Sequence, residues 1–203
     1  NWDKLIHSLE VRAAQEEDEF SKLQILEEIA TTWLNNLNNA PKALETYGRM
    51  FEIQPSDRHV QEQVEKLASQ TLNLEAWAGL YRKALKENRI DDDIERGRVT
   101  LSLARLLTER MNNEEESCAL CSALIEENPE EMEAYEILEW TFAHKRDYPA
   151  LLKLWIKKAE IVQDDTQKQD LLVKIATIQE EILHNEEDAC ETYRQLLDID
   201  ASN

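Results

Sequence analysis

The sequence predicts an all-α fold built from a succession of helical hairpins, and three observations support this prediction. First, apolar residues recur at positions i, i+3, i+4 and i+7, the spacing that lines one face of a helix. One such set is Leu26, Ile29, Ala30 and Trp33. Second, the 203 residues include only 3 Gly and 4 Pro, so few residues would interrupt helices. Third, similar features return at a fixed interval, which indicates an internal repeat.

The internal repeat is visible in separate features that keep one register. One series of small residues consists of Ala30, Ala104 and Ala176, at intervals of 104 − 30 = 74 and 176 − 104 = 72. A second series with the same intervals consists of Pro55, Pro129 and Ala201. The tripeptide Glu-Thr-Tyr occurs at 45–47 and again at 191–193. An interval of this length is too long for one hairpin, so each period is expected to contain two.

The first elements can be placed from their boundary residues. An amphipathic helix is expected over residues 2–15, followed by a hairpin over residues 24–57. The asparagines between 35 and 39 favour a turn over a helix, so the first helix of this hairpin should end there. Pro41 fits the first turn of the second helix, where its missing N–H costs nothing. Pro55 ends that helix, and the Ser-Asp pair after it can cap the next one.

The rest of the chain continues in the same way. Helices are expected over residues 57–70, 74–88, 116–127, 130–145, 148–162, 164–184 and 187–198, and a long helix capped by the aspartates at 91–93 is expected to run through Leu107 and to end at residues 112–113. Runs of aspartate at 91–93 and 164–165 precede two of them and are suited to N-cap positions. This makes about eleven helices with short loops, and residues 1–203 are predicted to be a single array. The chain begins with Asn1 and ends soon after a helix, so we expect it to be part of a longer protein.

The spacing of these residues resembles the tetratricopeptide repeat, in which a small residue on the first helix is followed by Ala-x3-aromatic and then Pro on the second. The best match consists of Leu26, Ile29, Ala30, Trp33, Ala43, Tyr47 and Pro55. Alternate units depart from the pattern, since Glu139 replaces a small residue and Leu80 and Leu151 replace alanine. The resemblance implies a right-handed α-α superhelix, or solenoid, in which small residues let paired helices approach to roughly 8–10 Å.

The composition limits the classes of partner. Acidic residues number 43 and basic residues 23, which gives a net charge of −20. Such a charge repels nucleic acids and makes a basic partner the natural expectation, although acidic surfaces often serve only solubility. No apolar run reaches the roughly 20 residues of a membrane span, and no signal peptide is evident. Three cysteines with no obvious pairing predict a reducing compartment, namely the cytoplasm.

Side chains that could support chemistry do not form a recognised site. Cys118 and Cys121 form a CxxC pair, but a structural zinc site needs four ligands and the only other cysteine, Cys190, lies one period away. We therefore interpret them as small buried residues. The aspartate run 91–93 lacks the ligand spacing and the glycine of a calcium loop. The four histidines are scattered, and no Gly-rich phosphate loop occurs. No cofactor, metal site or catalytic residue is predicted.

The resemblance to tetratricopeptide repeats also implies where a partner would bind. In such arrays the first helices line a concave groove, and the contact residues lie near the small residue of each. Carried over to this chain, the candidate partner-binding residues are Lys66, Ser69, Leu101, Arg105, Ile137, Trp140, Lys174 and Thr177. The alternative is that Trp140 packs into a neighbouring hairpin and that the cations pair with nearby glutamates.

These observations predict a non-enzymatic scaffold that binds a segment of another protein in a concave groove. A second hypothesis is an architectural array within a larger assembly, which could self-associate through its open ends. A third is a metal- or thiol-dependent enzyme, which the residues favour less.

Overall fold

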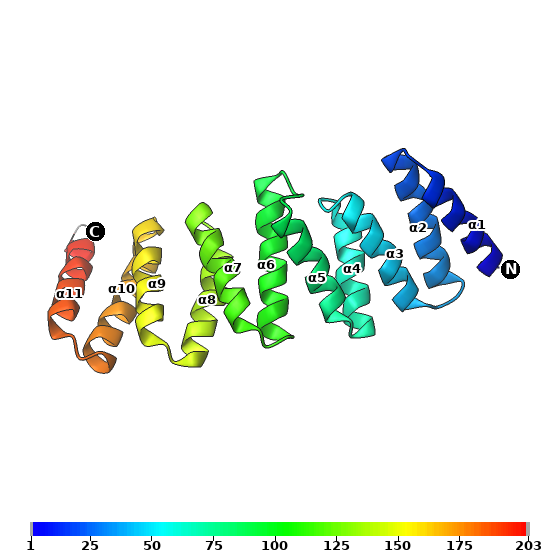
Figure 1. The fold of residues 1–203 in the computed structure, drawn as a ribbon. Coiled ribbons are helices and arrows are strands. Elements are labelled where there is room, and N and C mark those ends of the chain that lie inside the picture. The colour runs from blue at the N-terminus through cyan, green and yellow to red at the C-terminus, as the bar shows by residue number, and fades with distance from the viewer. Residues whose placement is uncertain (1, 202–203) are drawn as a thin grey trace. The chain divides into compact units, whose positions relative to one another are not determined.

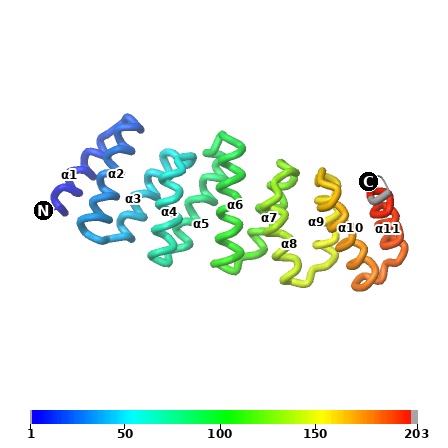
Figure 2. The backbone as a smooth tube through the Cα atoms, turned by 180° about the vertical axis from the view of Figure 1, so that it is seen from behind, coloured from blue at the N-terminus to red at the C-terminus, as the bar shows by residue number. Residues whose placement is uncertain are grey.

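The computed structural model describes residues 2–201, with side chains for residues 2–199. Contacts divide the chain into two compact units, unit 1 (Asn1–Met111) and unit 2 (Asn112–Asn203). Figure 1 and the reverse view in Figure 2 show the helices of each unit. The single array predicted over residues 1–203 stays a prediction, because each unit is defined by its own internal contacts.

Unit 1 is a succession of helices, each of which packs against the next along the chain. Its described helices are α1 (Trp2–Gln15), α2 (Glu19–Asn35), α3 (Ala40–Ile53), α4 (Arg58–Thr71), α5 (Leu74–Lys86) and α6 (Asp93–Glu109). Helices α3 and α5 also contact each other. Gly48 of α3 faces Leu80 of α5 in this contact, and a Cβ added at Gly48 would lie 3.4 Å from Cδ1 of Leu80, an ordinary van der Waals distance.

Unit 2 follows the same principle. Its described elements are α7 (Glu114–Glu127), α8 (Met132–Lys145), α9 (Tyr148–Ile161), α10 (Asp165–Thr177), the π-helical segment η1 (Ile178–Ile182) and α11 (Glu186–Ala201). The all-α prediction is confirmed, since the described residues of both units form eleven α-helices and no strand. None of these helices combines the length and the apolar character needed to cross a bilayer.

The small residues of the repeat are buried as predicted. Ala30, Ala104 and Ala176 each have 0% of their surface exposed, and so does Ala68 on α4. An alanine at such a position lets the backbone of a neighbouring helix approach closely, because no longer side chain separates the two. Glu139 replaces the small residue on α8, and there the carboxylate is partly exposed and forms an ion pair with Lys158 of α9 at 2.7 Å.

The predicted N-caps are formed. The side chain of Asp92 accepts a hydrogen bond from the N–H of Glu95 at 2.8 Å, and Asp164 accepts one from Gln167 at 2.8 Å. Asp57, which follows Pro55, accepts from the N–H of His59 at 2.9 Å. Each cap satisfies an N–H group that has no partner within the helix.

The turns inside the hairpins share a left-handed residue that is not glycine, and Asn88, in the connection between α5 and α6, is left-handed too. The described residues with positive φ are Asn38, Leu72, Asn88, Asn112, Arg146 and His184. Asn38 and Asn112 are 112 − 38 = 74 positions apart, and Leu72 and Arg146 are 146 − 72 = 74 apart. The repeat of two hairpins found in the sequence therefore also governs backbone conformation at the turns.

The end of α10 differs from the prediction of one helix over residues 164–184. The α-helix ends at Thr177 and continues as a π-helical turn through Ile178–Ile182. Within this turn Gln179 is buried, and its Oε1 atom accepts a hydrogen bond from Thr192 of α11 at 2.7 Å. Such wider turns are rare in helices and are frequent at functional sites.

Candidate partner-binding surface

The residues predicted to bind a partner belong to the first helices of the hairpins, so they fall into both units. The predicted residues are Lys66 and Ser69 on α4, Leu101 and Arg105 on α6, Ile137 and Trp140 on α8, and Lys174 and Thr177 on α10. Each unit is considered on its own. Their role in binding stays a prediction.

In unit 1 the predicted residues differ in exposure. Lys66 and Arg105 are exposed, and Ser69 is half-buried. Leu101 is only 6% exposed and belongs to the core, so it offers no surface to a partner. The reason is that α6 buries more than one face, with Thr100 and Leu101 buried as well as the residues of the alanine face.

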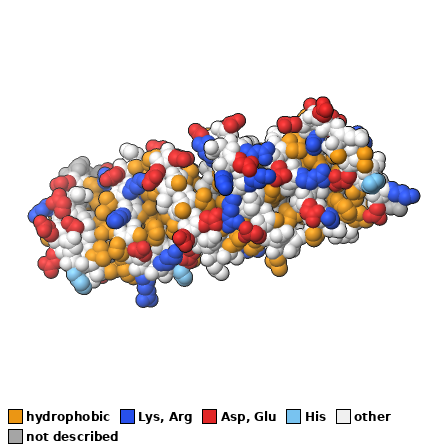
Figure 3. Space-filling model, in the orientation of Figure 1, with side chains coloured by type: hydrophobic (Ala, Val, Ile, Leu, Met, Phe, Trp, Pro, Cys, Tyr) orange, Lys and Arg blue, Asp and Glu red, His pale blue; other side chains and the backbone are white. Residues whose placement is uncertain are grey.

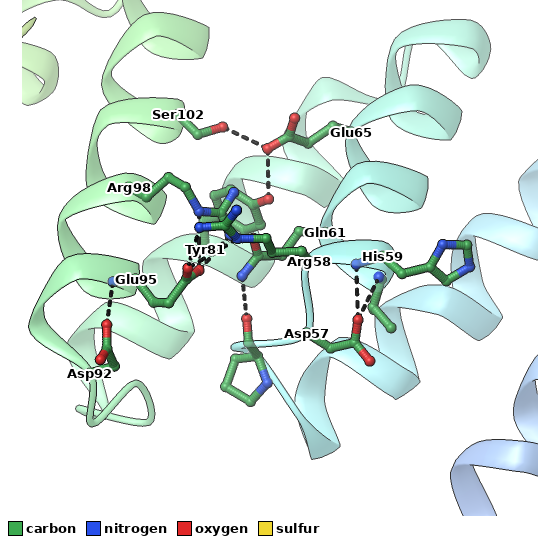
Figure 4. A network of polar contacts seen from close by, with 12 residues as sticks. Asp57, Arg58, His59, Gln61, Glu65, Tyr81, Asp92, Glu95, Arg98 and Ser102 are labelled. Atoms are coloured by element: carbon green, nitrogen blue, oxygen red, sulfur yellow. Dashed lines mark hydrogen bonds and ion pairs between the residues drawn. The ribbon is translucent and has the colours of Figure 1, made fainter.

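Two further acidic residues on these helices hold the hairpins together. Glu27 on α2 accepts a hydrogen bond from the hydroxyl of Tyr47 at 3.0 Å, and Glu65 on α4 accepts one from Tyr81 at 2.8 Å. Burial, reinforced by the nearby carboxylate, raises the pKa of both tyrosines, so both remain protonated donors. Glu65 also accepts from Ser102 of α6 at 2.7 Å, as Figure 4 shows. These carboxylates therefore connect neighbouring helices within unit 1.

A network of ion pairs connects α4 with α6 beside these contacts (Figure 4). Glu95 accepts hydrogen bonds from Arg98 at 2.6 Å and from Arg58 at 2.9 Å. Arg98 also donates to Gln61, a buried residue whose amide donates to the carbonyl of Pro55 at 2.6 Å. The hydrogen bond from Arg98, followed by that from Arg58, holds the pKa of Glu95 below its ordinary value. Most of the charge on this part of unit 1 is thus internally neutralised.

In unit 2 the most prominent predicted residue is Trp140. It is 52% exposed and stacks on His144 one turn later, with ring centroids 5.1 Å apart and ring planes at 4°. The alternative that Trp140 packs into a neighbouring hairpin therefore does not describe its position, since half of the indole faces solvent. Ile137 on the same helix is half-buried. The stacking restricts the indole without covering it.

One of the two predicted residues on α10 contacts a second tryptophan. Lys174 is exposed and lies over the ring of Trp155 from α9, 5.8 Å from its centroid. Lys174 therefore has an aromatic partner. The alternative prediction was that it would pair with a nearby glutamate. Thr177 donates its hydroxyl to the carbonyl of Val173 at 2.8 Å, and Val173 itself is 46% exposed. His144 and Trp155 were not predicted as members of this surface.

Figure 3 shows how the side-chain types are distributed on one face of each unit. Hydrophobic side chains surface over the region of α8–α10, whereas basic and acidic side chains crowd over α5 and α6. In unit 2 the partly exposed apolar residues include Trp140, Ile156 and Val173. Solvent-exposed apolar side chains bordered by charged ones are typical of interaction surfaces.

The three cysteines are free. Cys118 and Cys121 were both predicted to be buried; Cys121 is fully buried, whereas Cys118 is only partly buried. Burial raises the pKa of Cys121 to about 12. Burial also raises the pKa of Cys118, so neither thiol forms a reactive thiolate at neutral pH. Cys190 is exposed. The part of the chain that the structure describes contains no group of three or more His, Cys, Asp or Glu placed to hold a metal ion.

Solved structures similar to this chain come from helical-repeat proteins. YrrB, described as a TPR protein with an unusual peptide-binding site, is 17% identical with a TM-score of 0.49, and the match covers 93% of this chain and 91% of YrrB. MamA is 12% identical with a TM-score of 0.48, over 85% of this chain and 91% of MamA. BtubC from P. vanneervenii is 11% identical with a TM-score of 0.46, over 99% of this chain and 89% of BtubC.

No protein-family model matches the chain, and no curated protein matches it. The resemblance to tetratricopeptide repeats rests on features of the molecule itself, namely helical hairpins with buried alanines in both units.

Proposed function

We propose that the chain is a non-enzymatic scaffold that binds a segment of another protein on the first helices of unit 2. The observation that carries this proposal is Trp140, a large aromatic side chain held by stacking on His144 while 52% of it stays exposed. Leaving such a side chain in water is unfavourable, and tryptophan is among the residues that contribute most to protein interfaces. Because it is already restricted by His144, Trp140 would lose little conformational freedom on binding.

The other predicted residues of α8 and α10 support a peptide ligand with apolar anchor residues. Ile137 on α8 and Val173 on α10 add partly exposed aliphatic surface, and Lys174 and Thr177 on α10 add polar groups. A partner helix or extended segment with apolar residues at regular spacing fits such a surface. The raised pKa of Cys121 supports the non-enzymatic part of the proposal, and the three free cysteines support a reducing compartment such as the cytoplasm.

The proposal is tested by selecting ligands for the whole chain from a library of random peptides displayed on phage. The selected peptides are synthesised, and their affinity is measured for the wild type and for Trp140→Ala. We expect the variant to bind at least about tenfold more weakly, as for a central aromatic contact. Phe20→Ala is the matched control, since Phe20 is 69% exposed on α2 in unit 1. Unchanged affinity for Trp140→Ala would mean that Trp140 is not a contact residue.

The second candidate function, self-association within a larger assembly, is supported by other exposed apolar residues. Trp2 and Val11 on α1 are 47% and 44% exposed, and Leu197 on α11 is 65% exposed. An architectural array would bury such residues against further helices. Light scattering over a range of protein concentrations distinguishes the two functions. A mass that grows with concentration, and that Leu197→Glu abolishes, would favour self-association.

A further inference from the structure

A cleft of about 380 Å³ opens in unit 2 beside the second helices α9 and α11, and it shares only α10 with the proposed first-helix surface. Residues of α9, α10, η1 and α11 line it, and we call it the α9–α11 cleft. Leu172 and Ile175 of α10 supply its apolar base, and Ile156 and Ala159 of α9 form one wall. Ile156 is 41% exposed, so the apolar lining is accessible to solvent.

The cleft lies where the backbones of two neighbouring second helices, α9 and α11, are separated. Within the described residues, the backbones of α9 and α11 do not approach each other closely, although both helices pack against η1 and α10, and side chains of both pack on one core cluster. In unit 1, by contrast, α3 and α5 touch where Leu80 lies against Gly48. On the opposite wall of the cleft, Thr192 of α11 bonds to Gln179 in the π-helical turn at 2.7 Å. This turn therefore forms part of the cleft, as π-helical turns frequently do at functional sites.

The charge around the cleft has one dominant sign. Its lining includes Glu160, Asp188 and Glu191, against one lysine, Lys168, and Glu191 also forms an exposed ion pair with Arg194 of the same helix at 3.0 Å. The whole of residues 112–203 contains 8 basic and 23 acidic residues, a net charge of 8 − 23 = −15, whereas residues 1–111 have 15 − 20 = −5. Most of the negative charge of the chain thus belongs to the unit that contains the cleft. A ligand with positive charge would be attracted to it over about a Debye length, roughly 8–10 Å.

We propose that the α9–α11 cleft binds a cationic amphipathic segment of a partner protein, which inserts an apolar side chain against Leu172 and Ile175 and places lysine or arginine beside Glu160 and Glu191. The apolar base and the acidic border select for both features in one ligand. A volume of about 380 Å³ is at the lower end of the range for ligand pockets, roughly 300–1,000 Å³. The cleft therefore accepts one or two side chains, and the rest of the segment lies along the helices that border it.

The probe for the test is an 18-residue amphipathic helical peptide of leucine and lysine, with a leucine-glutamate peptide of the same pattern as the control ligand. Affinities are measured by calorimetry with the full chain at about 0.15 M salt, where long-range attraction is screened. We expect the lysine peptide to bind and the glutamate peptide not to bind. Binding of neither peptide, or of both equally, would overturn the proposal.

The variant Ile156→Asp separates insertion into the cleft from general electrostatic attraction. It makes the cleft more negative, so attraction alone would leave the affinity unchanged or raise it. Insertion of an apolar side chain predicts the opposite, a loss of about tenfold, which corresponds to roughly 50 Å² of apolar contact. Circular dichroism confirms that the variant is folded. An affinity equal to or above that of the wild type would contradict the proposal.

A pair of charge reversals locates the electrostatic contribution. The double variant Glu160→Lys and Glu191→Lys is compared with Glu126→Lys and Glu127→Lys, which has the same net charge and changes two exposed residues of α7. We expect a loss of about tenfold for the cleft variant and at most about twofold for the control. Equal losses would show that the peptide responds only to net charge.

Trp140→Ala serves to separate this site from the first-helix surface and should leave binding of the lysine peptide unchanged. If Trp140→Ala weakens binding and Ile156→Asp does not, the peptide occupies the first-helix surface and the cleft proposal is wrong. Sedimentation of Ile156→Asp provides the last comparison. A change in self-association would mean that the cleft holds a second copy of the chain, which would also refute a cationic partner.

Discussion

Replacing Glu65 with alanine is expected to destabilise unit 1 by about 2–3 kcal/mol. The Oε1 atom of Glu65 accepts hydrogen bonds from Tyr81 at 2.8 Å and from Ser102 at 2.7 Å. Tyr81 has none of its surface exposed, so the variant leaves its hydroxyl group without an acceptor in the core. An unpaired buried donor of this kind costs about 1–3 kcal/mol. Ser102 is half-buried and can bond to water, so its loss adds less than about 1 kcal/mol.

The free energy of unfolding is measured by urea denaturation followed by circular dichroism. Hydrogen exchange then shows where protection is lost, and the loss is expected on α4–α6. Glu62→Ala is the matched control, because Glu62 is exposed on the same helix. Tyr81→Phe removes the donor together with its need for an acceptor, so the double variant with Glu65→Ala should show a coupling energy of about 1–2 kcal/mol. A coupling indistinguishable from zero would refute the claim that this hydrogen bond joins the hairpins.

Three other predictions concern unit 1. Ala104→Leu should destabilise it by about 1–3 kcal/mol in urea denaturation, since the fully buried site has no room for a larger side chain; a stability equal to that of the wild type would mean that the helices are not closely packed there. Asp92→Ala should cost about 1 kcal/mol through loss of the N-cap bond to Glu95, whereas Asp91→Ala, at an exposed neighbour, should change stability by less than about 0.5 kcal/mol. Because Arg98 and Arg58 lower the pKa of Glu95 in the folded state, the contribution of Glu95 is present above its unfolded pKa, about 4.3, and is lost as pH falls through the lower folded pKa. The difference between the urea midpoints at neutral and at acidic pH should therefore be smaller for the Glu95→Gln variant than for the wild type. An equal difference in the two proteins would contradict this assignment.

The hairpin architecture could be predicted because it depends on local signals in the sequence. Apolar spacing identified the helical faces, and aspartates such as Asp92 and Asp164 marked helix starts because their caps involve residues only a few positions away. The buried alanines were identified by their common interval, which a regular stack of helices imposes. The end of α10 was not foreseen, since the π-helical turn depends on Gln179 reaching Thr192 on another helix.

The candidate surface could be predicted only in part, because exposure is set by how several helices pack together. Trp140 was chosen from its register and is exposed, but Leu101, chosen from another position of the same pattern, is buried in unit 1. Glu27 and Glu65 have the spacing of contact residues and instead bind tyrosines of the following helix. The α9–α11 cleft has no sequence signal at all, since it depends on how far apart the backbones of two helices lie.

The concentration of negative charge in residues 112–203 has a thermodynamic consequence. Fifteen uncompensated charges on one compact unit repel each other in the native fold and are farther apart in the unfolded chain. Added salt should therefore raise the melting temperature of unit 2 more than that of unit 1. A polycation that binds only the native fold would do the same at far lower concentration, so that thermal protection itself reports ligand occupancy.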